Sequence, residues 1–547
     1  MADRSVINRP RQTRVAPPFS TPSPTRGMNT VQNPAAMEPG YAISLQNAIC
    51  MPDGVALRTG TRKWATGLGT AVTTLIPYTS GSTAPNKLFA IAGTNMYDVT
   101  TGGAVGAPVL TGLNASAPYW QFASQTFTAG GTNYVIAVNG TDTPRLYNGS
   151  AWSTCTQVAS PSGPGQFKTG TPLIEDIVDV TLHQQRLWVV VKNTTKGYYL
   201  DIAAIGGELK PFDFGPFFAN GGTLHKLASW TVDAGGSSGS QALLAAISNQ
   251  GDIAIYQGDD PTQASTFKLI ATYKVAPPVG RRCTAKRAGD VLVMSQQGMF
   301  ALSTLLQSAR VDTSQTVTYN IAPTISDIAA TLATLPGFEI QNYAEQDLVI
   351  LNIPQINQAN NFQFVLNTIT GGWSQFTGWP ARCWAQFNST AFFGAAGDVM
   401  IAFIGYKDNS NIDGSAGSTI IATGLTAFSE LGDIGLTGVR KHVKQLQPIL
   451  TTGDSAPVLR IGVNVDYDFI PIVGASTINP ITGAVWDSAL WDNPGSTWVG
   501  SLATNKQWVT PRSWPGVAVA IALSLSASAE TKWVSTTWMV EPGDIYG

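Results

Sequence analysis

Three carboxylates stand close together in the sequence, at Glu175, Asp176 and Asp179. A pair of carboxylates can hydrolyse a glycosidic bond, one as the general acid and the other as the base or nucleophile. An apolar run at residues 178–182 overlaps this cluster and is typical of a β-strand. Because a charged turn before a strand is far more common than a catalytic pair, we interpret these carboxylates as part of such a turn.

Two further strings resemble parts of enzyme motifs. Residues 235–239 match the nucleophile pattern Gly-x-Ser-x-Gly, but they lie in a Gly/Ser-rich stretch, whereas a nucleophile elbow needs a strand before it and a helix after it. Residues 492–498 come close to the repeated Asp box of sialidase-type propellers, but the string occurs once and its spacing is off by one. No Gly-Lys-Ser/Thr phosphate loop and no His-Glu-x-x-His string occurs. We therefore expect a protein that is not an enzyme and assign no catalytic residue.

Potential metal ligands are few and scattered. Residues 409–414 have the spacing of half a calcium loop, but Ile420 occupies the position of its bidentate Glu. Three histidines are isolated in the sequence: His183, His225 and His442. Four cysteines lie far apart, with no Cys-x-x-Cys pair: Cys50, Cys155, Cys283 and Cys383. We expect no metal site and no cofactor, and we expect the cysteines to be buried free thiols.

A cluster of four cations lies between a Pro-Pro pair and the start of an apolar run: Arg281, Arg282, Lys286 and Arg287. Such side chains could contact DNA phosphates if this loop faces a DNA-filled channel. A solvated loop or a salt bridge between subunits is the more ordinary interpretation. The chain as a whole adds no general attraction to nucleic acid, because 32 Lys and Arg face 34 Asp and Glu.

A second group of cations lies near the N-terminus: Arg4, Arg9, Arg11 and Arg14. Apolar anchors accompany them in the same segment: Val6, Ile7, Val15 and Phe19. Residues 1–26 also contain five prolines, so this segment cannot fold alone. We assign residues 1–40 to an extended, basic, Pro-rich arm that wraps a neighbouring subunit or partner. A solvated tail is the alternative.

The elements that would position these residues are strands. Only 12% of the residues are charged, while the chain has 55 Gly, 33 Pro and 15 Trp. Glu and Lys fill exposed helix faces, whereas aromatic and β-branched residues fill strands. This composition excludes a coiled coil and a helical bundle, and it predicts an all-β protein with many tight turns.

A hairpin pattern recurs along the chain: an apolar run, a Gly/Asn/Asp turn and a second apolar run. The hairpins begin at residues 87, 134, 186, 242, 290, 347 and 391. This spacing, with a preceding strand before most hairpins, is typical of a β-propeller with about four strands per blade. We predict a propeller of six or seven blades over residues 41–405; a stack of β-sandwich domains is the alternative.

Two other regions depart from this pattern. Residues 326–335 have helical spacing, with Ser326 as a potential N-cap and Pro336 as the stop. Residues 406–547 have the pattern of a Gly-rich linker followed by long strands. This pattern predicts a β-sandwich-like ring or interface domain with a Trp-rich packing surface. No apolar run is long enough for a membrane span, and the N-terminus lacks a signal-type apolar core. We therefore expect synthesis in a cytoplasm.

Short strings spread over nearly the whole chain resemble tail proteins of short-tailed bacteriophages. Examples are Ala-Val-Asn-Gly-Thr-Asp-x-Pro-Arg-Leu-Tyr-Asn-Gly at residues 137–149, Pro-Val-Gly-Arg-Arg-Cys at 278–283 and Asn-Thr-Ile-Thr-Gly-Gly-Trp at 367–373. Further strings lie at residues 24–29, 34–42, 45–47, 54–60, 186–188, 254–258, 376–379 and 462–466. Together they are similar to the nozzle, or tail tubular component, of podovirus tails.

This resemblance implies a propeller-bearing structural subunit copied around the tail axis, usually as a hexamer. It implies contact with an adaptor ring on the portal side and with tail spikes or fibres. The ring would retain the packaged genome and conduct phage DNA without sequence specificity, so the protein would reside in the virion tail after synthesis in the host bacterium. The main alternative is a glycan-binding propeller adhesin that recognises a host receptor; a propeller hydrolase is a third class.

Overall fold

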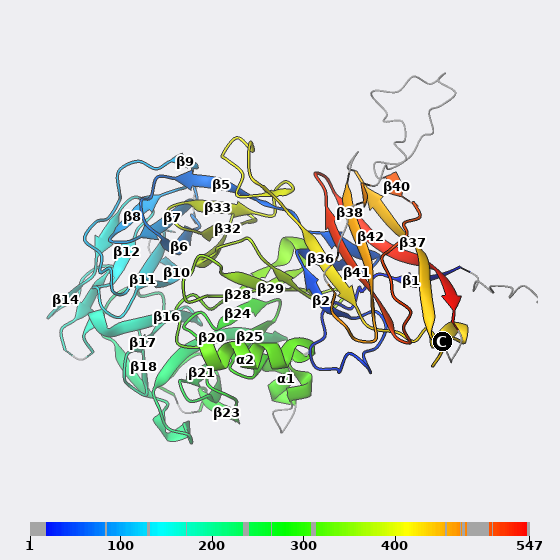
Figure 1. The fold of residues 1–547 in the computed structure, drawn as a ribbon. Helices are drawn as coiled ribbons and strands as arrows, with labels where there is room; N and C mark the ends of the chain where they lie inside the picture. Colours follow the sequence, from blue (N-terminus) through cyan, green and yellow to red (C-terminus); the bar gives the residue numbers. More distant parts are fainter. Residues whose placement is uncertain are drawn as a thin grey trace, which may run out of the picture. The chain divides into compact units, whose positions relative to one another are not determined.

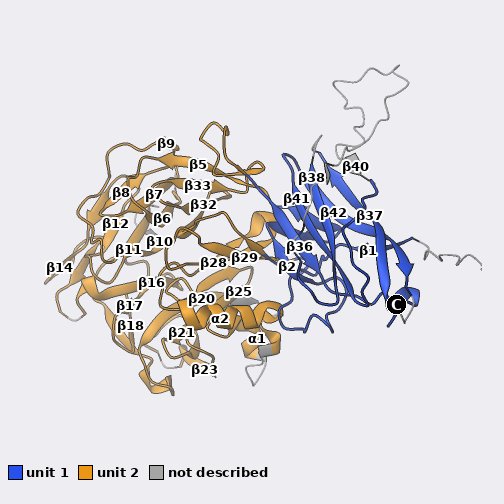
Figure 2. Cartoon of the chain, in the orientation of Figure 1, with its two compact units in different colours: residues 1–58, 369–374, 419–547 blue, residues 59–368, 375–418 orange. Residues whose placement is uncertain are grey.

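The computed structural model describes most of the chain. The described residues are 18–81, 85–127, 132–170, 172–233, 240–263, 265–307, 313–453, 457–470, 472, 476–477, 503–505 and 507–543. Strands dominate them (Figure 1). The chain divides into two compact units: unit 1 contains residues 1–58, 369–374 and 419–547, and unit 2 contains residues 59–368 and 375–418 (Figure 2).

Unit 2 consists mainly of seven successive groups of antiparallel strands, which we number as blades 1 to 7. The strands of blade 6 belong to a larger, nine-stranded sheet. Blade 1 contains β6 (Val72–Tyr78), β7 (Lys87–Ala92) and β8 (Asn95–Asp98). Blade 2 contains β10 (Gln121–Phe127), β11 (Thr132–Val138), β12 (Arg145–Tyr147) and β13 (Trp152–Thr154). Blade 3 contains β16 (Ile177–His183), β17 (Arg186–Val191), β18 (Lys196–Tyr199) and β19 (Lys210–Asp213). Blade 4 contains β20 (Leu224–Asp233), β21 (Ser240–Ser248), β22 (Asp252–Gln257) and β23 (Lys268–Lys274).

The remaining blades follow in the same order along the chain. Blade 5 contains β24 (Thr284–Arg287), β25 (Asp290–Ser295) and β26 (Gly298–Ala301). Blade 6 contains β27 (Glu339–Tyr343), β28 (Leu348–Ile353) and β29 (Phe362–Asn367). Blade 7 contains β31 (Cys383–Phe387), β32 (Thr390–Gly394) and β33 (Val399–Ala402), and its fourth strand is β5 (Thr61–Thr66). β30 (Trp373–Phe376) begins in unit 1 and ends in unit 2.

Clusters of apolar side chains join most neighbouring blades. Trp120 of the segment before β10 packs with Phe89 of blade 1, and Trp188 of blade 3 packs with Leu244 of blade 4. Corresponding clusters lie between blades 2 and 3 and between blades 4 and 5. Because such aromatic and branched side chains are almost fully removed from water, this packing supplies the main stabilisation of the unit.

The sheet arrangement closes on itself. β5, the first strand of unit 2, pairs antiparallel with β33, the last strand of blade 7, and Phe392 of this blade packs with Leu75 and Leu88 of blade 1. Contacts between every successive pair of blades, and between blade 7 and blade 1, define a seven-bladed β-propeller. The predictions of an all-β fold and of six or seven blades are confirmed, and the number of blades is seven.

Short elements connect the blades. The other strands of unit 2 are β9 (Gly103–Ala104), β14 (Thr156–Val158), β15 (Gln166–Lys168) and β34 (Lys407–Asp408), while β35 (Ser418–Thr419) reaches the boundary with unit 1. The α-helices are α1 (Leu302–Gln307) and α2 (Ala322–Leu332). The 3-10 helices are η1 (Ile174–Asp176), η2 (Gly215–Phe217), η3 (Thr313–Gln315), η4 (Tyr319–Ile321), η5 (Ala344–Gln346) and, in unit 1, η6 (Gly432–Ile434).

The predicted helix exists, but its predicted start is wrong. α2 begins at Ala322 and ends at Leu332, so Ser326 lies inside it rather than at the N-cap. Pro323 occupies the first turn, where the missing N–H removes no intrahelical bond and the fixed φ favours helix initiation. The face that carries Ile325, Ala329 and Leu332 is buried.

Unit 1 is a β-sandwich. Its first sheet contains β1 (Phe19–Pro22), β3 (Ala48–Met51), β4 (Gly54–Leu57), β37 (Lys441–Thr452), β40 (Ala503–Asn505) and β42 (Thr531–Pro542). Its second sheet contains β2 (Ala42–Gln46), β36 (Ala422–Thr426), β38 (Val458–Val465), β39 (Ser476–Thr477) and β41 (Val519–Ser526). Leu45, Leu523 and Leu525 of one sheet and Leu57 and Trp533 of the other line the same apolar interior. The prediction of a β-sandwich-like domain is thereby confirmed.

The unit boundaries differ from those predicted from the sequence. Residues 41–58 belong to unit 1 rather than to the propeller, because β2 pairs with β36 and β4 pairs with β42. Residues 406–418 belong to unit 2 rather than to the C-terminal domain. Strand pairing over several hundred residues of chain sets these limits, and local composition carries no signal of it.

The predicted N-terminal arm is described from residue 18 onward; Arg4, Arg9, Arg11 and Arg14 lie outside the described residues. Phe19 is in β1, which pairs with β42, and its ring stacks on Trp538 with the ring centroids 6.1 Å apart. Arg26 forms an ion pair with Glu38 at 2.5 Å and lies over the ring of Tyr41. Residues 18–40 are therefore part of unit 1 in this chain.

Candidate functional site: the axial cavity of the propeller

The first strands of six blades surround one cavity of about 420 Å³. Its lining comes from β6, β10, β20, β24, β27 and β31, together with Arg282, which precedes β24. Because these strands belong to blades on all sides of the ring, the cavity lies on the propeller axis, and we call it the axial cavity. A second cavity of about 240 Å³ shares Gln121 and Arg282 with it, so these two side chains lie between the cavities.

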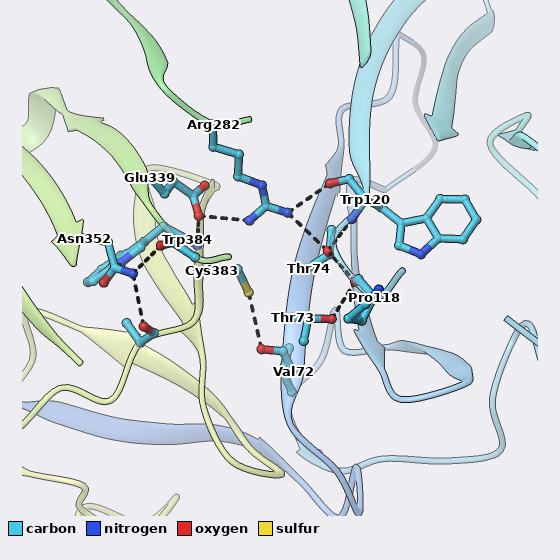
Figure 3. A network of polar contacts seen from close by, with 12 residues as sticks. Val72, Thr73, Thr74, Pro118, Trp120, Arg282, Glu339, Asn352, Cys383 and Trp384 are labelled. Atoms are coloured by element: carbon cyan, nitrogen blue, oxygen red, sulfur yellow. Dashed lines mark hydrogen bonds and ion pairs between the residues drawn. The ribbon is translucent and has the colours of Figure 1, made fainter. Parts of the chain in front are cut away.

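Arg282 connects strands from several blades (Figure 3). Its guanidinium forms an ion pair with Glu339 of β27 at 2.9 Å. On its other side it donates hydrogen bonds to the hydroxyl of Thr74 in β6 at 3.1 Å and to the carbonyl oxygen of Trp120 at 3.0 Å. Glu339 also accepts the backbone N–H of Trp384 in β31 at 3.0 Å. One cation thus joins blades 1, 2, 5, 6 and 7 at the axis.

Burial sets the electrostatics of this pair. The Arg282 and Glu339 side chains are 12% and 10% exposed. Burial raises the pKa of Glu339, and the opposing effect of the adjacent guanidinium is smaller. Because charge-assisted hydrogen bonds satisfy both partners, the pair holds its geometry inside the protein.

A second buried ion pair lies at the same axis. Lys226 of β20 contacts both carboxylate oxygens of Asp179 in β16, at 3.0 and 3.2 Å. Asp179 is 2% exposed as a side chain and Lys226 is 12% exposed. This contact joins blades 3 and 4, so the two ion pairs together involve every blade.

The four clustered cations of the sequence differ in the cavities that they line and in the groups that they contact. Arg282 and Lys286 line the axial cavity, and Arg281 and Arg282 line the second cavity. Arg281 donates a hydrogen bond to the carbonyl oxygen of His225. Arg287 ends β24 and is half-buried.

One part of the DNA-channel prediction requires correction. Arg282 is nearly buried and its guanidinium is bonded to protein groups, so it is not available to DNA phosphates. A cavity of this size is in the range of small-molecule sites and cannot admit a duplex. For Lys286 and Arg287, contact with DNA stays a prediction that a single chain does not test.

The three neighbouring carboxylates of the sequence do not act together. Asp176 forms an ion pair with Lys192 at 2.7 Å, and Asp179 pairs with Lys226. Glu175 accepts a hydrogen bond from the hydroxyl of Thr143 at 3.4 Å. Each carboxylate has its own structural partner, as the interpretation as a charged turn predicts. The Gly-x-Ser-x-Gly string at 235–239 and the Asp-box-like string at 492–498 lie outside the described residues.

The histidines of the propeller are hydrogen-bonded within it. The two ring nitrogens of His183 lie 2.8 Å from the hydroxyl of Ser229 and 2.9 Å from the carbonyl oxygen of Gly258. Burial, aided by the nearby Arg281, lowers the pKa of His225 to about 4. Both rings are neutral at pH 7, which suits a packing role.

Other potential ligands are also engaged or dispersed. Asp413, in the loop that resembles half a calcium site, accepts hydrogen bonds from the backbone and hydroxyl of Ser415. Within the described ranges, no group of three His, Cys, Asp or Glu side chains could hold a metal ion. All four cysteines are free and buried, which confirms the prediction for them. None of the helices in the described part of the chain has the length and apolar character to cross a membrane.

The sequence did not single out most of the axial residues. Glu339, Gln121, Lys226 and Asn342 lie on first strands, which have weaker apolar patterns than the hairpins that follow them. The only signal was the rarity of charged residues in this chain, 12% of the total. An isolated Glu or Lys in an apolar strand predicts a buried pair in such a composition.

Comparisons with known proteins leave the function open. No protein-family model and no curated protein sequence matches the chain. One solved structure with some likeness is BBS1N in complex with ARL6DN, at 12% identity and a TM-score of 0.36, covering 63% of this chain and 97% of that one. A second is Raptor from Chaetomium thermophilum, at 11% identity and a TM-score of 0.34, covering 62% of this chain and 29% of that one. A third is YCF48 from Cyanidioschyzon merolae, at 13% identity and a TM-score of 0.32, covering 61% of this chain and 96% of that one. All three TM-scores are low, so the propeller assignment rests on strand pairing within this chain.

Proposed function

We propose that the chain is a structural virion protein, the nozzle subunit of a podovirus tail. Copies of it form a ring, a hexamer, around the DNA ejection channel below an adaptor ring, and the ring retains the packaged genome and conducts it on infection. The observation that carries this proposal is the resemblance of strings along the whole chain to such tail proteins. The propeller that this resemblance implies is present in unit 2.

The internal geometry of the propeller favours a packing role over a catalytic one. The charged side chains described at its axis are mostly committed to ion pairs, and the thiols and His183 are buried. Because Arg282 crosses the axis and the two cavities described there are small, a DNA channel has to be enclosed between copies of the chain. A closed ring of this kind needs heterologous contacts between unlike surfaces of neighbouring copies.

Unit 1 offers apolar surface for such contacts. Its exposed large apolar residues include Trp514, Phe469, Ile470 and Tyr467, with 61%, 58%, 43% and 38% of their surface exposed. Apolar surface of this kind marks protein interfaces. Of the tryptophans behind the predicted Trp-rich surface, Trp533 and Trp538 are buried in the core of unit 1. Trp486, Trp491 and Trp498 lie outside the described residues.

Mass photometry and negative-stain electron microscopy of the purified chain test the proposal. The expected species is a six-fold ring with six times the 57.7 kDa subunit mass, about 350 kDa. Deletion of residues 1–17 removes the basic arm but keeps β1, and it should shift the population toward single subunits. Trp514→Asp should do the same through unit 1.

A matched variant separates arm charge from arm length. Changing Arg4, Arg9, Arg11 and Arg14 to Gln keeps the length of the segment and removes its charge. An effect equal to that of the deletion assigns the contact to charge, while a smaller effect assigns it to the apolar and Pro-rich residues. A chain that stays single at all concentrations, with no six-fold ring in images of the assembled tail, would contradict the proposal.

A further inference from the structure

The axial cavity contains polar groups that the protein itself leaves without partners. Lys286 of β24, Gln121 of β10 and Asn342 of β27 line it. Within the described ranges, none of these three side chains forms a hydrogen bond or an ion pair with another protein group. Polar groups that converge on a cavity without protein partners are typical of a ligand site, because a ligand or water must satisfy them.

The charges around the cavity leave one uncompensated cation. Arg282 is paired with Glu339, and Lys226 is paired with Asp179. Lys286 is exposed on β24 and has no carboxylate partner among the described residues, and its partial removal from water lowers its pKa. A ligand with a negative charge would provide the missing counter-ion.

Two more amides of the lining are held so that their carbonyl oxygens remain free. Gln341 donates its Nε2–H to the carbonyl oxygen of Asn342 at 2.9 Å. Gln386 donates its Nε2–H to Glu345 at 2.5 Å. Their oxygens are left as acceptors, while Gln121 and Asn342 offer both donors and an acceptor. Adjacent hydroxyl groups, which donate and accept in turn, are the natural complement of several planar amides.

Apolar residues also line the cavity. They include Pro77, Phe122, Ala285, Ile340 and Ala385. Such surface suits the C–H face of a ring that carries hydroxyl groups at its edge. The volume, about 420 Å³, is within the range of natural small-molecule sites.

We propose that the axial cavity binds a small acidic sugar, a hexuronate or the uronate end of a saccharide. Lys286 pairs with the carboxylate, and Gln121, Asn342, Gln341 and Gln386 bond the ring hydroxyls. The site belongs to a single propeller, so it does not depend on ring formation or on the proposed place in a tail.

The test measures binding of D-glucuronate and D-galacturonate to the full chain by isothermal titration calorimetry and saturation-transfer NMR. D-glucose and D-galactose are the neutral probes, and acetate and inorganic phosphate are the probes for simple anion binding. At least one uronate should bind with a millimolar or lower Kd, more tightly than its neutral counterpart. Lys286→Gln should weaken this binding by about tenfold or more, since it removes a charge-assisted hydrogen bond.

Matched variants keep the result interpretable. Lys268→Gln makes the same change on β23, at an exposed lysine outside the cavity lining, and should leave the Kd unchanged. Asn342→Ala should weaken uronate and neutral sugar alike, since it removes hydroxyl contacts rather than charge. Thermal unfolding of each variant shows that it is folded.

Three outcomes would overturn the proposal. The first is no detectable binding of either uronate to the wild-type chain. The second is equal loss of affinity in Lys286→Gln and Lys268→Gln, which would place the interaction outside the cavity. The third is binding of acetate or phosphate as tight as that of the uronates, which would reduce the cavity to a simple anion site.

Discussion

The ion pair between Arg282 and Glu339 offers a quantitative test of the propeller's internal contacts. The two side chains are nearly buried and their closest atoms are 2.9 Å apart. Glu339→Gln keeps the shape of the side chain but removes its charge, so the guanidinium remains buried without its counter-ion. Removing one partner of a buried pair costs about 3–5 kcal/mol of unfolding free energy, far more than an average surface change.

This cost converts into a measurable change in melting temperature. Unfolding entropy is about 2.1 cal/mol/K per residue, so a unit of roughly 350 residues should lose about 5 °C of Tm for about 4 kcal/mol. Differential scanning calorimetry of the full chain measures this shift in the propeller transition. The matched control is Glu208→Gln, which removes the partner of Lys168 in a pair whose side chains are 48% and 57% exposed. An exposed pair contributes at most about 1 kcal/mol, so its Tm should change by about 1 °C or less.

Equal small shifts in the two variants would refute the reasoning, because burial would then make no difference to the pair. The double variant Arg282→Met with Glu339→Gln removes the unpaired charge and should recover part of the lost stability. Recovery should be incomplete, since the carbonyl oxygen of Trp120 and the hydroxyl of Thr74 still lose their donor. A double variant less stable than Glu339→Gln alone would show that these hydrogen bonds outweigh the ion pair.

Three further predictions concern closure, pH and thiol reactivity. Gly394→Ala would place a Cβ 2.6 Å from the carbonyl oxygen of Val72, where blade 7 meets blade 1, so we expect urea unfolding to show a loss of about 1–3 kcal/mol in the free energy of unfolding. Gly106→Ala is the control and should be neutral, because the space around Gly106 is open. The pKa of His225 is about 4 in the folded chain against 6.5 in the unfolded chain, so its contribution to the free energy of unfolding is full above pH 6.5 and is lost as the pH falls toward 4. This loss is at most about 3 kcal/mol, and His225→Gln should abolish this part of the pH dependence of unfolding. Burial raises the pKa of the four cysteines to about 11 or 12, so Ellman's reagent should label none of them in the folded chain and all four after unfolding; rapid labelling of the folded chain would contradict their burial.

The hairpins could be predicted from sequence because their signals are local. Each has two apolar runs and a turn within a short stretch, and all seven predicted hairpins occur, from β7–β8 to β32–β33. The closure of the ring could not be predicted, because β5 precedes every blade and pairs with β33 more than 300 residues later. The same is true of β2, whose partner β36 follows the whole propeller.

Part of the axial site could also be predicted from sequence, because its cations are close together in the chain. A cluster of four cations is conspicuous in a chain with 12% charged residues, so Arg282 and Lys286 could be singled out. Their surroundings could not, since Glu339 lies 57 residues from Arg282 in the sequence and only the blade arrangement brings the two together. In the sequence, an unpaired cation cannot be distinguished from a cation in a buried ion pair, because only the fold shows whether a counter-ion lies beside it.

The propeller axis and a DNA channel place opposite demands on a protein. A channel needs an open passage, whereas the axis is crossed by Arg282 with contacts that join five blades. In the proposed ring the channel wall is therefore outer surface, and with 32 cations against 34 anions that surface has no strong average attraction for phosphates. Under the uronate proposal, the charge of Lys286 serves the cavity rather than the channel. Lys286→Gln should accordingly leave the ring intact in mass photometry while it weakens uronate binding; loss of the ring in this variant would contradict the separation of the two roles.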